Sequence, residues 1–92
     1  MTQEHLSALL AAGEATKSGE GWMTLPDARS LTLYVAAGGT TLSIGRVHAV
    51  RQDAALLHAK THKGEHYVVA LADLYAGSVD AAAGVTKKAG FL

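Results

Sequence analysis

The sequence predicts an α+β domain, built on a small antiparallel β-sheet or a partly open small barrel of about four or five strands. Three observations predict this class. Apolar residues recur at helical spacing near the N-terminus, they alternate with polar residues through the middle of the chain, and glycine-bearing turns separate the alternating runs. With 92 residues, of which 49% are hydrophobic, the chain can fill one small core, so we expect a single domain over residues 1–92.

An amphipathic helix is predicted over residues 3–15. Leu6, Leu9 and Leu10 lie at the spacing that places side chains on one helical face. The glycine-containing residues 16–21 then form a loop. Because a helix of this length is marginal on its own, its leucine face packs either on the sheet of its own chain or on a partner or a second copy.

Residues 22–70 are predicted to form a β-rich core. The alternation changes parity between Ile44 and Val47, which indicates a β-bulge or bend at Gly45. Short turns between extended segments favour antiparallel hairpins. The predicted extended segments are 22–25, 31–35, 42–49, 55–62 and 66–71, and the predicted turns are 37–40, 52–53 and 62–65.

The last part of the chain, residues 71–92, is predicted to form a short helix and a terminal strand. Apolar residues recur at three- and four-residue steps from Leu71 to Val79, which predicts a helix near 71–79. Residues 85–92 are predicted to add one more strand.

Composition and charge exclude several classes of function. Eight basic residues balance eight acidic ones, so no global field attracts nucleic acid or an anionic membrane. The absence of cysteine excludes disulfides, thiolate zinc sites and cysteine nucleophiles. No apolar run reaches the roughly 20 residues of a membrane helix, and the N-terminus lacks the basic region of a signal peptide. We therefore expect a cytoplasmic protein with no membrane contact and no cofactor. No catalytic motif is present, so we expect no enzymatic activity.

Three histidines, His58, His62 and His66, follow one another at four-residue steps. Metal binding needs imidazoles that converge on one point. A hairpin through Gly64 points His58 and His62 the same way and places His66 across the turn, which is geometrically compatible with a surface metal site. Without a further ligand such as a cysteine the pattern is weak, and solvated side chains on an exposed strand face explain it more simply. We therefore predict no bound metal.

Basic residues gather in the same part of the chain. They fall on neighbouring predicted strands and turns, where together with histidines they can form one basic face: Arg46, Arg51, Lys60, Lys63, His48, His58 and His62. Nucleic-acid binding on such a face needs exposed aromatic rings for base stacking. The chain has few aromatic residues, and Trp22, Tyr67, Tyr75 and Phe91 are expected to be at least half committed to the core. A solvated strand face is therefore the simpler interpretation.

The order of hydrophobic segments from residue 31 onward resembles a known family, and it does so by spacing more than by residue identity. The segments that carry the resemblance are 42–50, 56–61 with 65–69, 71–74 and 85–92. In that order, they are similar to the strand–bend–strand segment, the following hairpin, the short leucine-bearing helix and the later strand of the LytTR-type DNA-binding domain of bacterial transcriptional regulators. The resemblance implies sequence-specific DNA binding, with Arg51, Lys87 and Lys88 as contacts.

These observations lead to two hypotheses of function. The first is a non-catalytic interaction or scaffold domain that self-associates as a homo-oligomer in a bacterial regulatory assembly, because association stabilises a small core. Its interface would comprise the surplus apolar residues Leu6, Leu9, Leu10, Phe91 and Leu92. The alternative is a DNA-binding regulator domain of the LytTR type. The neutral net charge does not favour this alternative, since duplex binding depends on neutralising phosphates.

Overall fold

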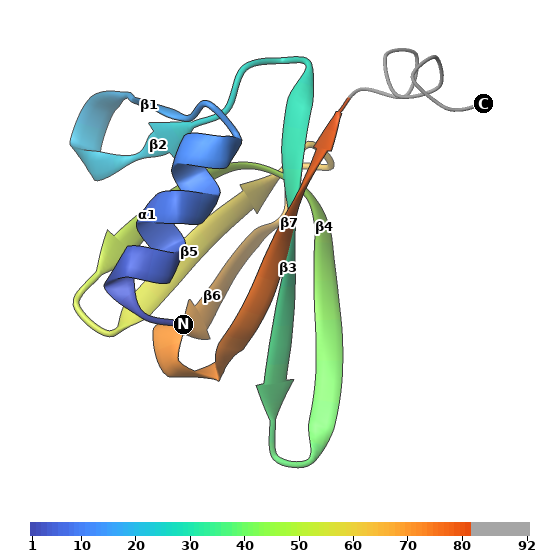
Figure 1. The fold of residues 1–92 in the computed structure, drawn as a ribbon. Coiled ribbons are helices and arrows are strands. Elements are labelled where there is room, and N and C mark those ends of the chain that lie inside the picture. The colour runs from blue at the N-terminus through green and yellow to red at the C-terminus, as the bar shows by residue number, and fades with distance from the viewer. Residues whose placement is uncertain (82–92) are drawn as a thin grey trace.

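A computed structural model describes residues 1–81 as an antiparallel sheet that curls into an open half-barrel around one N-terminal helix (Figure 1). The predicted α+β class with a partly open barrel is confirmed. In chain order the elements are α1 (Gln3–Ala12), β1 (Thr16–Lys17), the 3-10 turn η1 (Gly19–Gly21), β2 (Met23–Thr24), β3 (Arg29–Ala37), β4 (Thr40–Asp53), β5 (Leu56–Thr61), β6 (His66–Ala70), the 3-10 turn η2 (Leu71–Asp73) and β7 (Leu74–Ala81).

Strand β4 is the centre of the sheet because three other strands pair with it. Its first half pairs with β3, while its second half pairs with β5 along one edge and with β2 along the other. Beyond these, β7 pairs with β3, β6 with β5, and β1 with β2. All of these pairings are antiparallel, and short turns join the strands of the β3–β4, β4–β5 and β5–β6 hairpins.

The predicted bend in β4 is present between Ile44 and Val47. Leu33 pairs with Ile44 but Leu31 pairs with Val47, so β4 has one residue more than β3 over this stretch. The extra residue turns Ile44 and Val47 toward the same side, and both are buried, at 3% and 0% exposure. The left-handed residue of the bend is Arg46, with φ of 58°, rather than its glycine neighbour.

Helix α1 begins at Thr2, whose side-chain hydroxyl accepts a hydrogen bond of 3.1 Å from a backbone N–H of the first turn. The helix ends at Ala12 rather than at residue 15, because Gly13 takes the C-cap position and Glu14 turns the chain with φ of 61°. A side chain at residue 13 would also force Leu25 to move, since its Cβ would lie 2.9 Å from Leu25 Cδ2.

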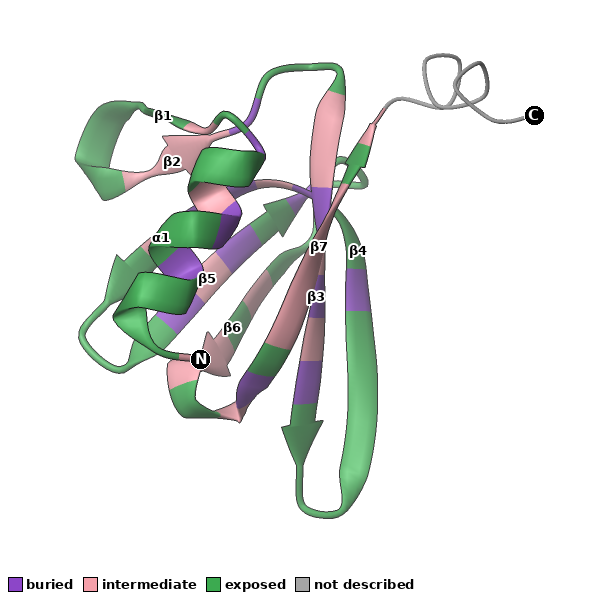
Figure 2. Cartoon of the chain, in the orientation of Figure 1, coloured by how far each residue is buried: buried purple, intermediate pink, exposed green. Residues whose placement is uncertain are grey.

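The leucine face of α1 packs on the concave side of its own sheet (Figure 2). Leu6 and Leu9 are only 2% and 8% exposed, and Leu10 is half-buried. Leu9 lies against β7 at Gly77, where an added Cβ would come within 2.5 Å of Leu9 Cδ2. Leu6 and Leu9 are therefore not an exposed interface in this structure. The curled sheet supplies the apolar surface that a helix of this length needs, so the intramolecular alternative is the one observed.

The helix predicted near 71–79 is wrong. Only the turn η2 is helical there, and the residues from Leu74 onward form β7, which pairs with β3 over most of its length. This pairing satisfies main-chain groups on the edge of β3, and Gly77 has a low helix propensity, so tertiary pairing outweighs the local spacing of apolar residues. The terminal strand predicted at 85–92 lies outside the described residues.

Two of the three predicted turns are confirmed and one is displaced. Gly38 and Gly39 both have positive φ in the β3–β4 turn, and residues 62–65 connect β5 to β6. The turn predicted at 52–53 lies two residues later, because β4 continues to Asp53. Its left-handed residue is Ala54, with φ of 56°, and an alanine gives no sequence signal for such a turn.

The core fills the space between α1 and the concave face of the sheet, where Figure 2 shows the buried residues gathered. Its largest fully buried side chains are those of Leu31, Leu33, Leu57, Leu74, Val47 and Val50. Over residues 1–81, none of the helices has the length and apolar character to cross a bilayer.

Candidate functional site

The outer face of β4, β5 and β6, opposite the core, holds most of the residues singled out in the sequence. In β5, Leu57 is fully buried, so the alternation of the strand turns His58 and Lys60 outward. The register then places Arg51 of β4 opposite His58 and His66 of β6 opposite Lys60. One aromatic side chain joins them. We call this set the histidine–tryptophan face: Trp22, Arg51, His58, Lys60 and His66.

Trp22 lies at the centre of this face. The Nζ atom of Lys60 is 4.3 Å from the centre of the indole ring, and the Cζ atom of Arg51 is 5.5 Å from it. Both distances lie within the range of cation–π attraction, which is worth about 0.5–1 kcal/mol at exposed sites. The rings of His58 and His66 meet the indole edge-on, with centroids 6.4 and 5.7 Å away. The indole therefore holds two cations and two imidazoles around one ring.

The loop before β2 fixes the position of Trp22. The Ser18 backbone N–H donates a hydrogen bond of 2.7 Å to the Trp22 carbonyl, and the hydroxyls of Ser18 and Thr24 are 2.9 Å apart. Gly21 has φ of 83°, and the aliphatic stem of Arg51 lies beside its Cα, where an added Cβ would be 3.7 Å from Arg51 Cγ and Cδ. The tight loop therefore places the indole beside Arg51.

His58 and His66 form a direct hydrogen bond across the β5–β6 hairpin. Nδ1 of His58 and Nε2 of His66 are 3.0 Å apart. They are diagonal neighbours, because His58 pairs with Val68 and Lys60 pairs with His66. One nitrogen must donate and the other accept, so at least one of the two rings is neutral when this bond is present.

His62 belongs to a different pair, with His48. Their rings are 4.9 Å apart and tilted by 32°, and the His62 backbone N–H donates to the Arg46 carbonyl at 3.0 Å. The pKa of His48 lies below its ordinary value, first because burial disfavours the charged ring and then because His62 and Lys60 are close. The three histidines His58, His62 and His66, which a hairpin could have brought to one site, therefore do not converge. In the part of the chain that the structure describes, no group of three or more metal-ligating side chains comes together.

Among residues 1–81, the cations of the face have no acidic partner. Within residues 1–81 the one ion pair joins Arg29 to Glu14 at 3.4 Å, away from this face. Asp53 lies two residues after Arg51 on β4 and forms no ion pair with it. The Nε atom of Arg51 is moreover buried without a hydrogen-bond partner. The face therefore presents unneutralised positive charge to solvent.

Two apolar side chains extend the same face beside the charged centre. Val68 of β6 is 50% exposed and pairs with His58, while Leu56 of β5 is 42% exposed and lies two residues before His58. By strand alternation both point outward with the histidines. The surface thus combines a cationic aromatic centre with an apolar margin.

The predicted basic face is reproduced in part. Arg51, His58 and Lys60 come together as expected, and the His48–His62 pair adjoins them, since Lys60 acts on His48. Arg46 lies instead at the bend of β4 and Lys63 in the β5–β6 turn. The remaining expected contacts and interface residues, Lys87, Lys88, Phe91 and Leu92, lie outside the described residues.

Sequence reasoning missed Trp22 as the organising residue. The parity of β2 was the available signal, because Met23 packs against the core and a residue with the opposite parity faces outward. His66 does lie across the hairpin from His58, as expected, but His62 contacts His48 instead, because the diagonal contact depends on the hairpin register.

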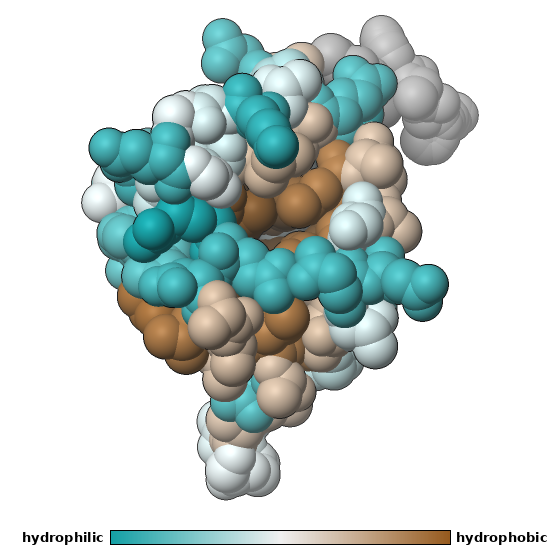
Figure 3. Space-filling model, turned by 90° about the vertical axis from the view of Figure 1, so that its left-hand side faces the viewer, coloured by the Kyte–Doolittle hydropathy of each residue, from teal (hydrophilic) through white to brown (hydrophobic). Residues whose placement is uncertain are grey.

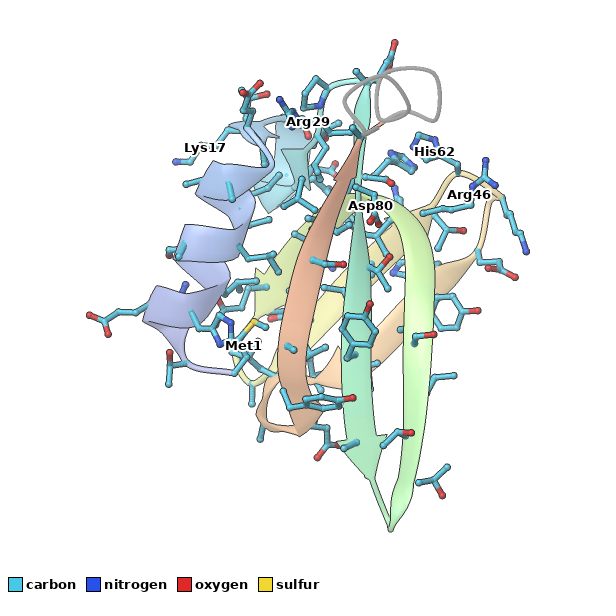
Figure 4. All side chains as sticks on the ribbon, turned by 45° about the vertical axis from the view of Figure 1, so that its right-hand side comes forward. Met1, Lys17, Arg29, Arg46, His62 and Asp80 are labelled. Atoms are coloured by element: carbon cyan, nitrogen blue, oxygen red, sulfur yellow. The ribbon has the colours of Figure 1, made fainter. Side chains whose placement is uncertain are left out.

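Two hollows lie elsewhere on the molecule. A polar cleft of about 630 Å³ opens near the bend of β4, where Arg29, Arg46, His62 and Asp80 lie around it (Figure 4). Two of these groups already have partners, since Thr32 donates to Asp80 at 2.7 Å and Arg29 pairs with Glu14. An apolar groove of about 410 Å³ runs between α1 and the sheet, and Figure 3 shows hydrophobic surface within a hydrophilic border on that side. Leu10 lines this groove.

Comparison with protein-family models, with curated proteins and with solved structures found no match. The resemblance to the LytTR domain stays a prediction. Inference about function therefore depends on the geometry of the histidine–tryptophan face.

Proposed function

We propose that this protein is a non-catalytic interaction domain that recognises an acidic, partly apolar segment of a protein partner through the histidine–tryptophan face. The observation that carries the proposal is the stacking of Lys60 and Arg51 on Trp22, at 4.3 and 5.5 Å, with no acidic side chain to neutralise either cation among residues 1–81.

The chemistry of the face matches an acidic segment. A guanidinium can donate two parallel hydrogen bonds to one carboxylate, because its N–H groups form a fixed fork. Contact with the Trp22 ring and with the Gly21 loop holds Arg51 in place, so less side-chain freedom is lost on binding. Tryptophan and arginine are also the residue types that most often dominate protein interfaces.

The apolar margin favours a protein over a nucleic acid. Leu56 and Val68 expose 42% and 50% of their surface next to the cations, and burying them against apolar side chains would contribute binding energy. A phosphate backbone offers no such contact. Duplex binding usually relies on many phosphate contacts, whereas the centre of this face has two permanent cations.

DNA binding is the second candidate, and the position of Arg51 is the observation that favours it. The LytTR resemblance implies Arg51 as a contact, and this residue lies on the exposed face beside an aromatic ring that can interact with bases. Self-association, the other predicted interaction, needs a surface different from Leu6 and Leu9, which are buried.

The test uses the intrinsic fluorescence of Trp22, the one tryptophan of the chain. The protein is titrated with a peptide of alternating glutamate and leucine, with the matching lysine–leucine peptide, and with oligonucleotides in single-stranded and duplex form. We expect a fluorescence change with the acidic peptide only. Arg51→Gln and Lys60→Gln should each weaken binding about tenfold, the loss expected for a charge-assisted hydrogen bond. Lys63→Gln, which removes a lysine from the neighbouring turn, should leave it unchanged.

Three outcomes contradict the proposal. The acidic peptide could fail to bind even at low salt, the lysine control could weaken binding as much as the face variants do, or an oligonucleotide could bind more tightly than the peptide. The last result, with a steep salt dependence, would establish the second candidate instead.

A further inference from the structure

His58 and His66 bring two imidazole nitrogens together on the surface, with Nδ1 of one 3.0 Å from Nε2 of the other. A hydrogen bond occupies these atoms in this structure. The same two atoms are also the ones that an imidazole uses to bind a transition metal, once each nitrogen presents a lone pair.

Although the sequence alone led us to predict no bound metal, the contact between the two rings changes this expectation, and we propose that His58 and His66 chelate one divalent transition-metal ion of the kind that prefers imidazole, namely Cu²⁺, Ni²⁺ or Zn²⁺. Two ligand nitrogens at bond lengths of about 2.0–2.1 Å lie about 2.9 Å apart at a right angle and about 3.3 Å apart at the tetrahedral angle. The observed separation of 3.0 Å is closest to the right-angled value. This geometry, like the general order of metal affinities, favours Cu²⁺ over Zn²⁺. To bind the ion, each ring must lose the hydrogen bond and turn so that its lone pair points at the metal rather than at the other nitrogen.

The hairpin holds both ligands in place. His58 lies between Leu57 and Ala59, which are fully buried, and its strand pairs with β6, which carries His66 next to the partly buried Tyr67. The backbone beneath the pair is therefore anchored in the core through β5. The Trp22 ring lies beside both imidazoles, with interplanar angles of 77° and 70°. The His58–His66 bond is exposed to solvent, so water can occupy the other coordination positions. The site would therefore form with little movement of the backbone.

The neighbouring cations oppose a bound metal, which makes the proposal separable from the function proposed above. Lys60 lies opposite His66 and Arg51 opposite His58, and each repels a second positive charge. Lys60→Gln should therefore tighten metal binding while it weakens binding of the acidic peptide. The metal site does not depend on the identity of the protein partner.

The experiment is isothermal titration of the full chain with CuCl₂, NiCl₂ and ZnCl₂ in a non-coordinating buffer at pH 7.5. Electron paramagnetic resonance of the Cu²⁺ sample reports nitrogen ligation independently. We expect one ion per chain, with Cu²⁺ bound most tightly. His58→Gln and His66→Gln should each weaken binding at least about tenfold, because even an outer-shell partner of a metal site is worth about 10- to 100-fold in affinity. His5→Gln on α1 should have no effect, and circular dichroism should show that all variants are folded.

Binding that persists unchanged in His58→Gln and His66→Gln would overturn the proposal, as would an absence of bound metal in the wild type. Loss of binding in His62→Gln alone would assign the ion to the His48–His62 pair and would also overturn it. If Lys60→Gln weakens metal binding as well as peptide binding, the inference that Lys60 repels the bound ion is refuted. If metal binds as described but the acidic peptide does not, only the proposed function is refuted.

Discussion

The contact between Leu9 and Gly77 gives the sharpest test of the fold, because it decides whether α1 is docked on β7. An added Cβ at Gly77 would lie 2.5 Å from Leu9 Cδ2 and 3.3 Å from Cδ1, so Gly77→Ala must displace the leucine or the strand. Such overpacking costs about 1–3 kcal/mol. Leu9→Ala removes a side chain that is 8% exposed and leaves a cavity, which costs about 2–5 kcal/mol.

The double variant should not show the sum of these losses. With Leu9 truncated, the methyl group at residue 77 no longer clashes and partly fills the cavity. Replacing glycine inside a strand also removes a penalty of about 0.5–1 kcal/mol. Gly77→Ala should therefore destabilise the wild type but stabilise the Leu9→Ala protein, a reversal of sign in the free energy of unfolding.

Urea denaturation followed by circular dichroism measures all four proteins of this double-mutant cycle, and equal slopes against urea would show that the comparison is valid. If Gly77→Ala changes the unfolding free energy by the same amount in both backgrounds, the helix does not pack on β7. The leucine face would then be available to a partner after all.

Three further predictions concern the sheet. Ala54→Gly should stabilise the protein by about 1 kcal/mol, since Ala54 has φ of 56° and a side chain is unfavourable in that conformation, whereas Ala55→Gly should not stabilise it; thermal unfolding compares the two. Leu57→Ala should cost about 2–5 kcal/mol while Leu56→Ala costs less than about 1 kcal/mol, because adjacent residues of β5 face opposite sides, and similar losses would refute the register. The pKa of His48 is lowered first by burial and then by the nearby positive groups, so the unfolded chain binds a proton at this residue more readily than the folded chain does. The free energy of unfolding should therefore fall as the pH drops through about 6.5. Urea midpoints at pH 7.5 and 5.5 should show a smaller fall in His48→Gln than in the wild type.

Much of the sheet was predictable because its local signals and its tertiary contacts agree. The parity change between Ile44 and Val47 required an extra residue, and the β-bulge is there. The glycines at 38 and 39 marked a hairpin turn that the structure contains. These features depend on the alternation of side chains along a strand and on the backbone freedom of glycine, and both can be recognised from residues that are adjacent in sequence.

The errors arise where distant residues decide the outcome. The apolar residues after Leu71 have helical spacing, but this segment pairs with the edge of β3 and forms a strand. The three histidines are regularly spaced in sequence, yet the register of two hairpins separates them into different pairs. The role of Trp22 depends on contacts with Arg51, Lys60 and two histidines, all of them far from it in sequence.

The position of β4 has a consequence for how the chain folds. Because β4 pairs with β2, β3 and β5, neither half of the sheet can complete its ladder before this strand is in place. We therefore expect the transition state for folding to contain β4 with one or two of its neighbours. We also expect folding to be slower than in helical proteins of equal length, because the β2–β4 and β3–β7 pairings join residues far apart in sequence. Substitutions in the second half of β4 should slow folding, whereas loss of the α1 contact should mainly speed unfolding.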